Sequence, residues 1–293
     1  MSHVTECPIC AGTVFNKFLT IQDYSVTRET FDIIRCTSCQ FLITSPIPAD
    51  LDRYYQSSSY VSHATKPKSL IDKIYHLVRR FTLRWKVNLI KKRTTAHPLR
   101  VLDYGCGTGD FLTACQAQGW EIAGVEPSAA ARAVAAERTR STIASDLKQL
   151  KSDNFHVITL WHVLEHVSDL NGILQQLKDK LTPTGIIFIA VPNHNSNDAK
   201  HYQQTWAAYD VPRHLWHFSQ DTMHLLLAKH QLKLVSTVPM KLDSFYVSML
   251  SEKYLHGQPS PITMARGLLQ GMQSNIKARK KYEYSSLIYI VRK

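Results

Sequence analysis

From residue 99 onward, short apolar runs alternate with longer segments in which apolar residues recur at every third or fourth position. Short apolar runs bounded by turn residues are typical of buried strands, and the longer period is typical of amphipathic helices. The predicted strands span residues 99–103, 121–126, 155–161, 185–191, 232–238 and 285–291. The predicted helices lie around residues 109–118, 128–139, 169–181 and 219–230. This alternation predicts an α/β fold, in which a parallel sheet has helices on both faces.

The pattern before residue 99 is different. Residues 14–18 and 30–34 are rich in β-forming side chains and predict two short strands. After a break at residues 44–48, which contain two prolines, residues 69–93 predict a long amphipathic helix. Its apolar positions follow i, i+3, i+4 spacing and are Leu70, Ile74, Leu77, Val78, Phe81, Trp85 and Leu89.

We therefore expect three parts in the chain. Residues 1–45 form a small module, residues 46–98 form a linker that contains the helix, and residues 99–293 form the α/β domain. Two insertions interrupt that domain, at about 192–218 and 239–283, and we expect them to cover a substrate.

Composition restricts the class of protein. The 293 residues are 44% hydrophobic, 10% aromatic and 20% charged, which is typical of a globular protein and excludes collagen, coiled coil and disorder. The longest apolar run, residues 186–191, has six residues. A membrane-spanning helix needs about 18 or more, so we expect no transmembrane segment.

Basic residues outnumber acidic ones, 35 to 23, which gives a net charge of +12 and favours an anionic partner or surface. Between residues 66 and 93 the only acid is Asp72. A basic amphipathic helix can lie on an anionic membrane surface or bind RNA phosphates. It can equally be a solvated helix whose apolar side covers the sheet or the active site. Residues 277–281, Lys-Ala-Arg-Lys-Lys, add to this basic charge. The basic residues of the 66–93 segment are Lys66, Lys68, Lys73, Arg79, Arg80, Arg84, Lys86, Lys91, Lys92 and Arg93.

Four of the six cysteines form two C-x-x-C pairs, Cys7 with Cys10 and Cys36 with Cys39, and 25 residues separate the pairs. Such pairs can supply four thiolates to one tetrahedral zinc ion. The alternatives are disulfides and chance. The first residues have no basic region followed by an apolar region, so we expect no secretory signal and a reducing, cytoplasmic location, which disfavours disulfides. Four thiolates leave no open coordination position, so we expect the zinc to be structural.

Residues 101–110, Val-Leu-Asp-Tyr-Gly-Cys-Gly-Thr-Gly-Asp, take an apolar strand into a glycine-rich turn and then a helix. Glycines there let the backbone approach a ligand closely, and the helix N-terminus can hydrogen-bond it. A dinucleotide fingerprint needs glycine at position 110, which is Asp110. Glu126 ends the next predicted strand, and its two oxygens can accept hydrogen bonds from both hydroxyls of a ribose. Alternatively, Asp103 is a turn residue and Glu126 caps a helix.

Residues 102–109 resemble motif I of class I S-adenosylmethionine-dependent methyltransferases. In the order of that family, Glu126 matches the ribose-binding acid, residues 145–147 the segment beside the adenine, residues 161–167 the motif after strand 4, and residues 181–185 the turn before strand 5. The resemblance implies a Rossmann-like, seven-stranded, mostly parallel sheet whose last strand, 285–291, inserts antiparallel. It implies S-adenosylmethionine as the cofactor, bound by Asp103, Gly105, Cys106, Gly107, Gly109, Glu126, Pro127, Asp146, Leu147, Trp161 and His162.

Methyl transfer is an in-line displacement from a sulfonium, so the protein mainly aligns and deprotonates the acceptor. The chain has 14 histidines as candidate bases. His162, Glu165 and His166 share one helical face and could bind a divalent metal. They resemble the Glu-x-x-Glu-His motif of ubiquinone-biosynthesis O-methyltransferases. The interpretation we favour is that Glu165 and His166 cap the helix and contact the methionine part of the cofactor.

Residues 211–219, Val-Pro-Arg-His-Leu-Trp-His-Phe-Ser, resemble the Tyr-x-Glu-His-x-x-Tyr-Phe-Ser run of zinc-containing sugar C-methyltransferases. That resemblance implies that His214 is the active-site histidine. This chain differs at Val211, Arg213 and His217, and Arg213 could hold an acidic group of the acceptor. The candidate catalytic residues are His214, His217 and His166; alternatively, His214 is structural.

Three functions compete. The first is a methyltransferase for a small-molecule acceptor such as a sugar, lipid or quinone-like compound. The second is an rRNA methyltransferase with a zinc ribbon, and the third is a non-catalytic module that keeps the cofactor fold. The complete set of Asp103, glycine loop and Glu126 argues against the third.

Overall fold

The computed structural model describes residues 3–55, 70–96, 98–150 and 153–293. The chain divides into two compact units. The first unit comprises Met1–Ser57, His162–Gly172 and Ile189–Ile290, and the second comprises Ser58–Trp161, Ile173–Phe188 and Val291–Lys293.

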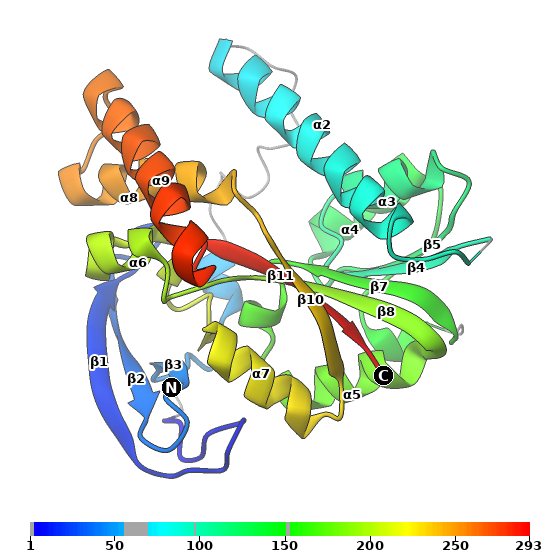
Figure 1. Cartoon of the computed structure of the whole chain (residues 1–293), viewed down its shortest axis with the longest axis horizontal. Coiled ribbons are helices and arrows are strands. Elements are labelled where there is room, and N and C mark those ends of the chain that lie inside the picture. The colour runs from blue at the N-terminus through cyan, green and yellow to red at the C-terminus, as the bar shows by residue number, and fades with distance from the viewer. Residues whose placement is uncertain (1–2, 56–69, 97, 151–152) are drawn as a thin grey trace. The chain divides into compact units, whose positions relative to one another are not determined.

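A seven-stranded sheet has the order β10-β11-β8-β7-β4-β5-β6 (Figure 1). The pairs β4/β5, β4/β7 and β5/β6 are parallel. The last strand of the chain lies between β10 and β8, so it is inserted into the sheet as the family resemblance implies. The α/β prediction with a seven-stranded sheet is therefore confirmed. The strands are β4 (Arg100–Tyr104), β5 (Glu121–Val125), β6 (Ile143–Ala144), β7 (Phe155–Trp161), β8 (Leu181–Pro192), β10 (Lys233–Pro239) and β11 (Ser286–Arg292).

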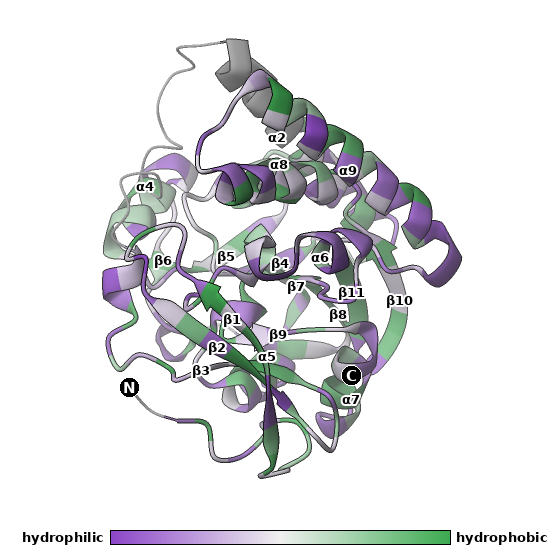
Figure 2. Ribbon diagram, turned by 90° about the vertical axis from the view of Figure 1, so that its left-hand side faces the viewer, coloured by the Kyte–Doolittle hydropathy of each residue, from purple (hydrophilic) through white to green (hydrophobic). Residues whose placement is uncertain are grey.

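Burial follows position in this sheet. Residues 186–191 of β8 are buried without a break, as expected for a central strand that is covered on both faces. Hydrophobic colour is also visible along the edge strand β10 (Figure 2), where Val235 is 46% exposed. The helices of the α/β pattern are α3 (Asp110–Gln116), α4 (Ala129–Thr139), α5 (Leu170–Lys180) and α7 (Gln220–Lys229).

A second, four-stranded sheet lies in the first unit and has the order β1-β2-β3-β9. The pairs β1/β2 and β2/β3 are antiparallel hairpins. The fourth strand is two residues from the predicted insertion: Leu42 pairs with His217, and Ile43 with Trp216. The N-terminal sheet is therefore completed by residues distant in sequence. The strands are β1 (Phe15–Gln22), β2 (Thr30–Cys36), β3 (Leu42–Ser45) and β9 (Trp216–His217).

The remaining helices include the hairpin α8 (Asp243–His256) and α9 (Pro261–Lys281). Gly257 ends α8 in a left-handed conformation, and Ser260 begins α9 with a capping box closed by Thr263. None of the helices in the described part of the chain is long and apolar enough to cross a membrane. The short helices are α6 (Asn197–Tyr202) and the 3₁₀ turns Asp52–Tyr55, Leu147–Gln149, Leu164–His166, Gln203–Thr205 and Ala207–Tyr209.

The predicted basic helix is α2 (Leu70–Lys91). Its buried residues differ from the predicted stripe: Val87 and Ile90 are buried, whereas Phe81 is 62% exposed. Four predicted positions, Leu70, Ile74, Leu77 and Val78, lie outside the described side chains. Within the second unit, the end of α2 is tied to the segment after α3, because Lys91 donates to Gln118 Oε1 at 2.6 Å.

Candidate cofactor, metal and acceptor sites

The glycine loop after β4 is held in a conformation that favours glycine. Gly105, Gly107 and Gly109 have φ of 74°, 54° and 77°, in the left-handed region. The N–H groups of Gly105 and Cys106 donate to Val125 O at 2.8 and 3.0 Å. A Cβ on Gly109 would lie 3.1 Å from Ala135, so this residue also lets α3 and α4 pack closely. The loop therefore presents backbone rather than side chains at the end of β4.

The Glu126 carboxylate joins this loop to the end of β5. Oε2 accepts from the Gly107 N–H at 2.8 Å and Oε1 from the Ser128 N–H at 2.9 Å, and the residue is 9% exposed. Each carboxylate oxygen can accept a second hydrogen bond. The Glu126 carboxylate therefore fits the predicted ribose contact, because each of its oxygens can still accept a hydrogen bond from a ribose hydroxyl. The carbonyls of Glu126 and Pro127 accept from Arg132 Nη1, both at 2.8 Å, so Pro127 belongs to the same turn.

Asp103 is buried at the end of β4 and accepts from Thr159 Oγ1 at 2.6 Å. Burial raises the pKa of its carboxyl to about 7, although the Thr159 hydrogen bond and the positive charge of Lys86 lower it. A cationic amino group bound beside Asp103 would favour the ionised form in the same way. Asp103 can therefore exchange a proton for a bound cation near neutral pH.

Trp161, at the end of β7, packs edge-on against Phe111, with ring centroids 5.4 Å apart. The Lys86 ammonium lies 4.2 Å from the centre of the Trp161 ring. The indole N–H is buried and has no hydrogen-bond partner among the described residues. Leu147 is also buried, whereas the Asp146 carboxylate caps a short turn by accepting from the Lys148 N–H at 2.8 Å.

The four paired cysteines come together as predicted. Their sulfur atoms all lie within 4.8 Å of one another, and Cys7–Cys39 and Cys10–Cys36 are each 3.5 Å apart. All four are free thiols. In a tetrahedral Zn–S₄ site with Zn–S of about 2.3 Å, sulfurs are about 3.8 Å apart. The arrangement therefore fits one zinc ion.

Both C-x-x-C turns have the same backbone form. The Cys7 N–H donates to Gly12 O and the Ala11 N–H to Cys7 O; likewise, the Cys36 N–H donates to Phe41 O and the Gln40 N–H to Cys36 O. Ala11 and Gln40, which follow the second cysteine of each pair, both have left-handed φ, 59° and 65°. Two non-glycine residues in this conformation at equivalent positions indicate that each turn is bent around its sulfurs. A Cβ on Gly12 would lie 2.9 Å from Ser38 Oγ and 3.2 Å from Cys36 Sγ, so a larger residue there would crowd the cluster.

His162 forms a charged triad in the first unit. Its Nδ1 lies 3.2 Å from Glu165 Oε1 and its Nε2 2.9 Å from Asp243 Oδ2. Burial lowers the pKa of His162, but the hydrogen bonds and charges of Asp243 and Glu165 outweigh this and raise it to about 10. Glu165 is fully buried, and its other oxygen has no partner among the described residues. The triad joins α8 to the turn that begins at residue 164.

Folding raises the pKa of His162 from 6.5 to about 10, so protonated His162 stabilises the folded protein. This contribution is fully present below about pH 6.5 and is lost as the pH rises through about 10. We expect His162→Asn to lower the melting temperature at pH 6.5 and to leave a smaller difference from the unmodified protein at pH 10. Thermal unfolding at both values measures this. His224→Asn, on the exposed side of α7, is the control. An equal loss at both pH values would contradict the ionic contribution.

His166 and His214 lie side by side, with ring centroids 4.5 Å apart. His214 Nδ1 donates to Ala208 O at 2.8 Å, and His166 Nδ1 lies 3.1 Å from Arg213 O and 3.0 Å from the Tyr55 hydroxyl, which can also accept. Carbonyl oxygens only accept, so both rings keep the lone pair on Nε2. Burial and the charge of His214 lower the pKa of His166 to about 4. With Glu165, these two histidines place ligand-type atoms within 4.8 Å of one another.

Arg213 does not point an open guanidinium at an acceptor. Its Nη2 donates to Asp210 Oδ1 at 2.7 Å and to Asp23 Oδ1 at 3.0 Å, and Nη1 donates to Tyr54 O at 3.1 Å. The guanidinium N–H groups of Arg213 are therefore bonded to residues of the first unit, and the residue is only 5% exposed. The expectation that Arg213 holds an acidic group of the acceptor is therefore wrong; Asp210 and Asp23 already supply that charge.

His217 is tied to the four-stranded sheet. Thr44 Oγ1 donates to His214 O at 2.6 Å and accepts from His217 Nε2 at 2.9 Å. Burial and the charges of His214 and His194 hold the pKa of His217 well below its ordinary value. Thr44 on β3 therefore contacts both candidate histidines of the 211–219 segment, a link that sequence analysis missed because a lone threonine gives no signal.

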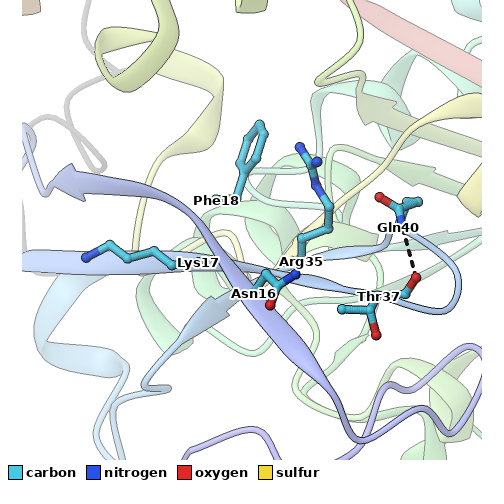
Figure 3. A pocket seen from close by; sticks show the side chains of 6 residues that line it. All are labelled: Asn16, Lys17, Phe18, Arg35, Thr37 and Gln40. Atoms are coloured by element: carbon cyan, nitrogen blue, oxygen red, sulfur yellow. Dashed lines mark hydrogen bonds between the residues drawn. The ribbon is translucent and has the colours of Figure 1, made fainter.

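A polar hollow of about 330 Å³ lies on the sheet formed by β1 and β2 (Figure 3). Phe18 and Arg35 point to the same side, and the guanidinium carbon of Arg35 lies 4.3 Å from the centre of the Phe18 ring. The hollow contains none of the predicted site residues. It is lined by Asn16, Lys17, Phe18, Arg35, Thr37 and Gln40.

Comparison with known proteins identifies the family. A family model described as a methyltransferase domain matches residues 73–237, more than half of the chain. The chain belongs to this methyltransferase family. A ubiquinone biosynthesis O-methyltransferase from Pseudomonas syringae pv. tomato is 29% identical over 38% of this chain and 51% of its own length. One from Rhodopseudomonas palustris is 31% identical over 33% of this chain and 41% of its own length. The chain thus spans about half the length of these relatives.

Solved structures support the fold. A cyclopropane synthase from Mycobacterium tuberculosis matches with a TM-score of 0.52 and 13% identity, over 82% of this chain and 95% of that one. Geranyl diphosphate C-methyltransferase from Streptomyces coelicolor, solved with Mg²⁺, geranyl diphosphate and S-adenosyl-L-homocysteine, matches with a TM-score of 0.51 and 12% identity, over 79% and 88%. At these identities the likeness concerns the fold alone.

Proposed function

We propose that the protein is an S-adenosylmethionine-dependent methyltransferase that acts on a small-molecule acceptor. The observation that carries this proposal is the hydrogen bond between the glycine loop and Glu126. The Glu126 carboxylate, which follows β5, accepts from the Gly107 N–H, and its oxygens can still accept hydrogen bonds from a ribose. Membership of the methyltransferase family supports it. When bound, the cofactor would supply the methyl group on a sulfonium, and Asp103 would face its cationic amino end.

The remaining predicted contacts suit the same cofactor. The left-handed Gly105, Gly107 and Gly109 leave room for close backbone approach, and buried Leu147 and Trp161 offer apolar surface. In this proposal Cys106 and Pro127 contribute backbone, and Asp146 borders the adenine. His162 has a different role, since both of its ring nitrogens are engaged by Glu165 and Asp243.

His214 is the residue we propose as general base. Its Nδ1 is fixed by Ala208 O, which leaves the Nε2 lone pair to accept a proton. The Asp210 carboxylate lies 4.0 Å from Nε2 and would stabilise the positive charge that this step creates. His166 is the second candidate, because it too keeps a lone pair on Nε2. His217 is the third candidate; its Nε2–H donates to Thr44, which leaves its lone pair on Nδ1.

Zinc is proposed as a structural ion bound by Cys7, Cys10, Cys36 and Cys39. The proposed division of the chain stays 1–45, 46–98 and 99–293, with insertions at about 192–218 and 239–283. The first insertion would then serve two purposes, because it contains both His214 and the strand β9 that completes the N-terminal sheet.

The acceptor class can be tested directly. Purified protein is incubated with S-adenosylmethionine labelled in its methyl group and, separately, with a lipid extract, a polar small-molecule extract and total RNA. We expect label in one of the small-molecule fractions, and the two extracts separate a lipid or quinone-like acceptor from a sugar. Label in RNA alone would overturn the acceptor class but keep the transfer reaction. No label in any fraction, with no cofactor binding by calorimetry, would overturn the reaction itself.

Glu126→Ala should weaken cofactor binding. The change removes a charged acceptor for the ribose and frees the Gly107 N–H, and a hydrogen bond to a charged group is worth about 1.5–3 kcal/mol. We expect the Kd for S-adenosylmethionine to rise by roughly ten- to a hundredfold in isothermal titration calorimetry. Glu137→Ala, at an exposed position on α4, is the matched control. An unchanged Kd in Glu126→Ala would place the cofactor elsewhere.

A further inference from the structure

In helix α9 the buried and exposed sides are reversed in hydrophobicity relative to an ordinary surface helix. Its buried residues are small or polar, and its large apolar residues point outward. A surface helix of a globular protein normally faces its apolar stripe to the core. The buried residues are Thr263, Gly267, Gln270, Gly271, Ser274 and Ala278. The outward ones are Ile262, Leu268, Leu269, Met272 and Ile276, which are 46–66% exposed.

Close packing against α8 fixes this orientation. A Cβ on Gly267 would lie 2.5 Å from Met249 Cα, and a Cβ on Gly271 would lie 2.8 Å from Phe245 Cα. Ser244 Oγ donates to Gly271 O at 3.1 Å across the same interface. The two helices form a hairpin (Figure 1) joined by Gly257–Ser260. Small residues that let two helices approach are typical of helix pairs in an apolar medium. Because larger side chains do not fit, α9 cannot rotate to bury its leucines.

The charge of α9 indicates which kind of partner could cover its exposed apolar residues. Helix α9 contains five basic residues and no acidic residue. All five are exposed: Arg266 beside the apolar stripe, and Lys277, Arg279, Lys280 and Lys281 in the last turns. Apolar side chains flanked by lysine and arginine are the pattern of a helix that lies in the plane of a bilayer interface. The basic residues would meet the negative surface potential of anionic lipids.

We propose that the α8–α9 hairpin docks the protein on an anionic lipid surface. The apolar stripe of α9, defined as Ile262, Leu268, Leu269, Met272 and Ile276, enters the interface, and its basic last turns contact lipid headgroups. The sequence predicts a contact with an anionic surface for the helix at 66–93, to whose charge residues 277–281 add. The exposed apolar stripe of α9 is a separate observation, and the contact of the 66–93 helix stays a prediction. The proposal does not depend on the methyl transfer reaction.

Vesicle co-sedimentation of the full chain tests it, with vesicles of phosphatidylcholine alone and of phosphatidylcholine with about a third phosphatidylglycerol. The unmodified protein should bind the anionic vesicles and release them at high salt. Leu269→Gln with Met272→Gln should reduce binding by roughly tenfold or more, because both side chains leave water in the docked state. Lys280→Glu with Lys281→Glu should reduce it similarly on anionic vesicles alone. These positions are exposed, so circular dichroism and cofactor affinity should be unchanged.

Matched substitutions elsewhere are the controls: Leu225→Gln, 46% exposed on α7, and Lys148→Glu with Lys233→Glu, both at exposed positions. Each should bind as the unmodified protein does. Absence of vesicle binding by the unmodified protein would overturn the proposal, as would equal binding to neutral and anionic vesicles. A dimer in analytical ultracentrifugation that Leu269→Gln with Met272→Gln dissociates, without vesicle binding, would assign the face to a second copy of the chain.

Discussion

Replacing His214 with asparagine should lower the rate of methyl transfer by about 10²–10⁴, the usual contribution of a general base. The side-chain amide of asparagine can still donate to Ala208 O, as His214 Nδ1 does, but it offers no lone pair in place of Nε2. The substitution therefore removes the proton acceptor while preserving the local hydrogen bond. We expect kcat to fall and the Kd for S-adenosylmethionine to stay within twofold.

Steady-state kinetics with the acceptor identified by labelling, together with calorimetry, make this measurement. His224→Asn, on the exposed side of α7, should leave both values unchanged. The His166 and His214 rings lie side by side, so either could take the same proton. The variant His166→Asn distinguishes between them. If His214→Asn kept full turnover and His166→Asn lost it, the base would be His166. If neither lost turnover, His217 would be the remaining candidate base.

The strands of the seven-stranded sheet were predictable because they are continuous apolar runs bounded by turns. The predicted bounds of β7, residues 155–161, equal the observed ones, and those of β4 and β5 differ by one residue. Glycine spacing and a carboxylate at the next strand end also carry local information, so both could be assigned to one cofactor site, whereas the hydrogen bond from the Gly107 N–H to Glu126 was not predicted. The strand β6, two residues long, was missed because it is too short to show a period.

Contacts between distant segments were not predictable. The pairing of β3 with β9 joins two short segments with ordinary sequences, and Asp243, the partner of His162, lies 81 residues away in the predicted insertion at 239–283. An acceptor-binding role was predicted for Arg213 because it stands next to His214 in the sequence. Its guanidinium is instead paired with Asp23 and Asp210. Such assignments depend on which carboxylates the fold brings close, and no local pattern encodes this.

Removal of zinc should unfold the N-terminal sheet and, with it, lower acceptor turnover. Apparent binding energies of structural zinc are about 10–16 kcal/mol, so Cys36→Ala should lose the ion and the folding energy coupled to it. The strand β2 ends at Cys36, and β3 contacts the 211–219 segment through β9 and through Thr44, which donates to His214 O. We therefore expect kcat to fall at least as far as in His214→Asn.

Cofactor binding separates this effect from general unfolding, because Gly107, Glu126 and Asp103 make the contacts described above within the second unit. Elemental analysis should give one zinc per chain in the unmodified protein and none in Cys36→Ala. The Kd for S-adenosylmethionine should change by no more than about threefold, which is a smaller free-energy change than the loss of one hydrogen bond to a charged group. Cys115→Ala, which changes a cysteine outside the two pairs, should keep its zinc. Thr44→Val keeps the four cysteines but removes the hydroxyl that bonds His214 O and His217, so it should lower turnover with zinc retained. Full turnover in zinc-free Cys36→Ala would show that the zinc module and the acceptor segment are independent.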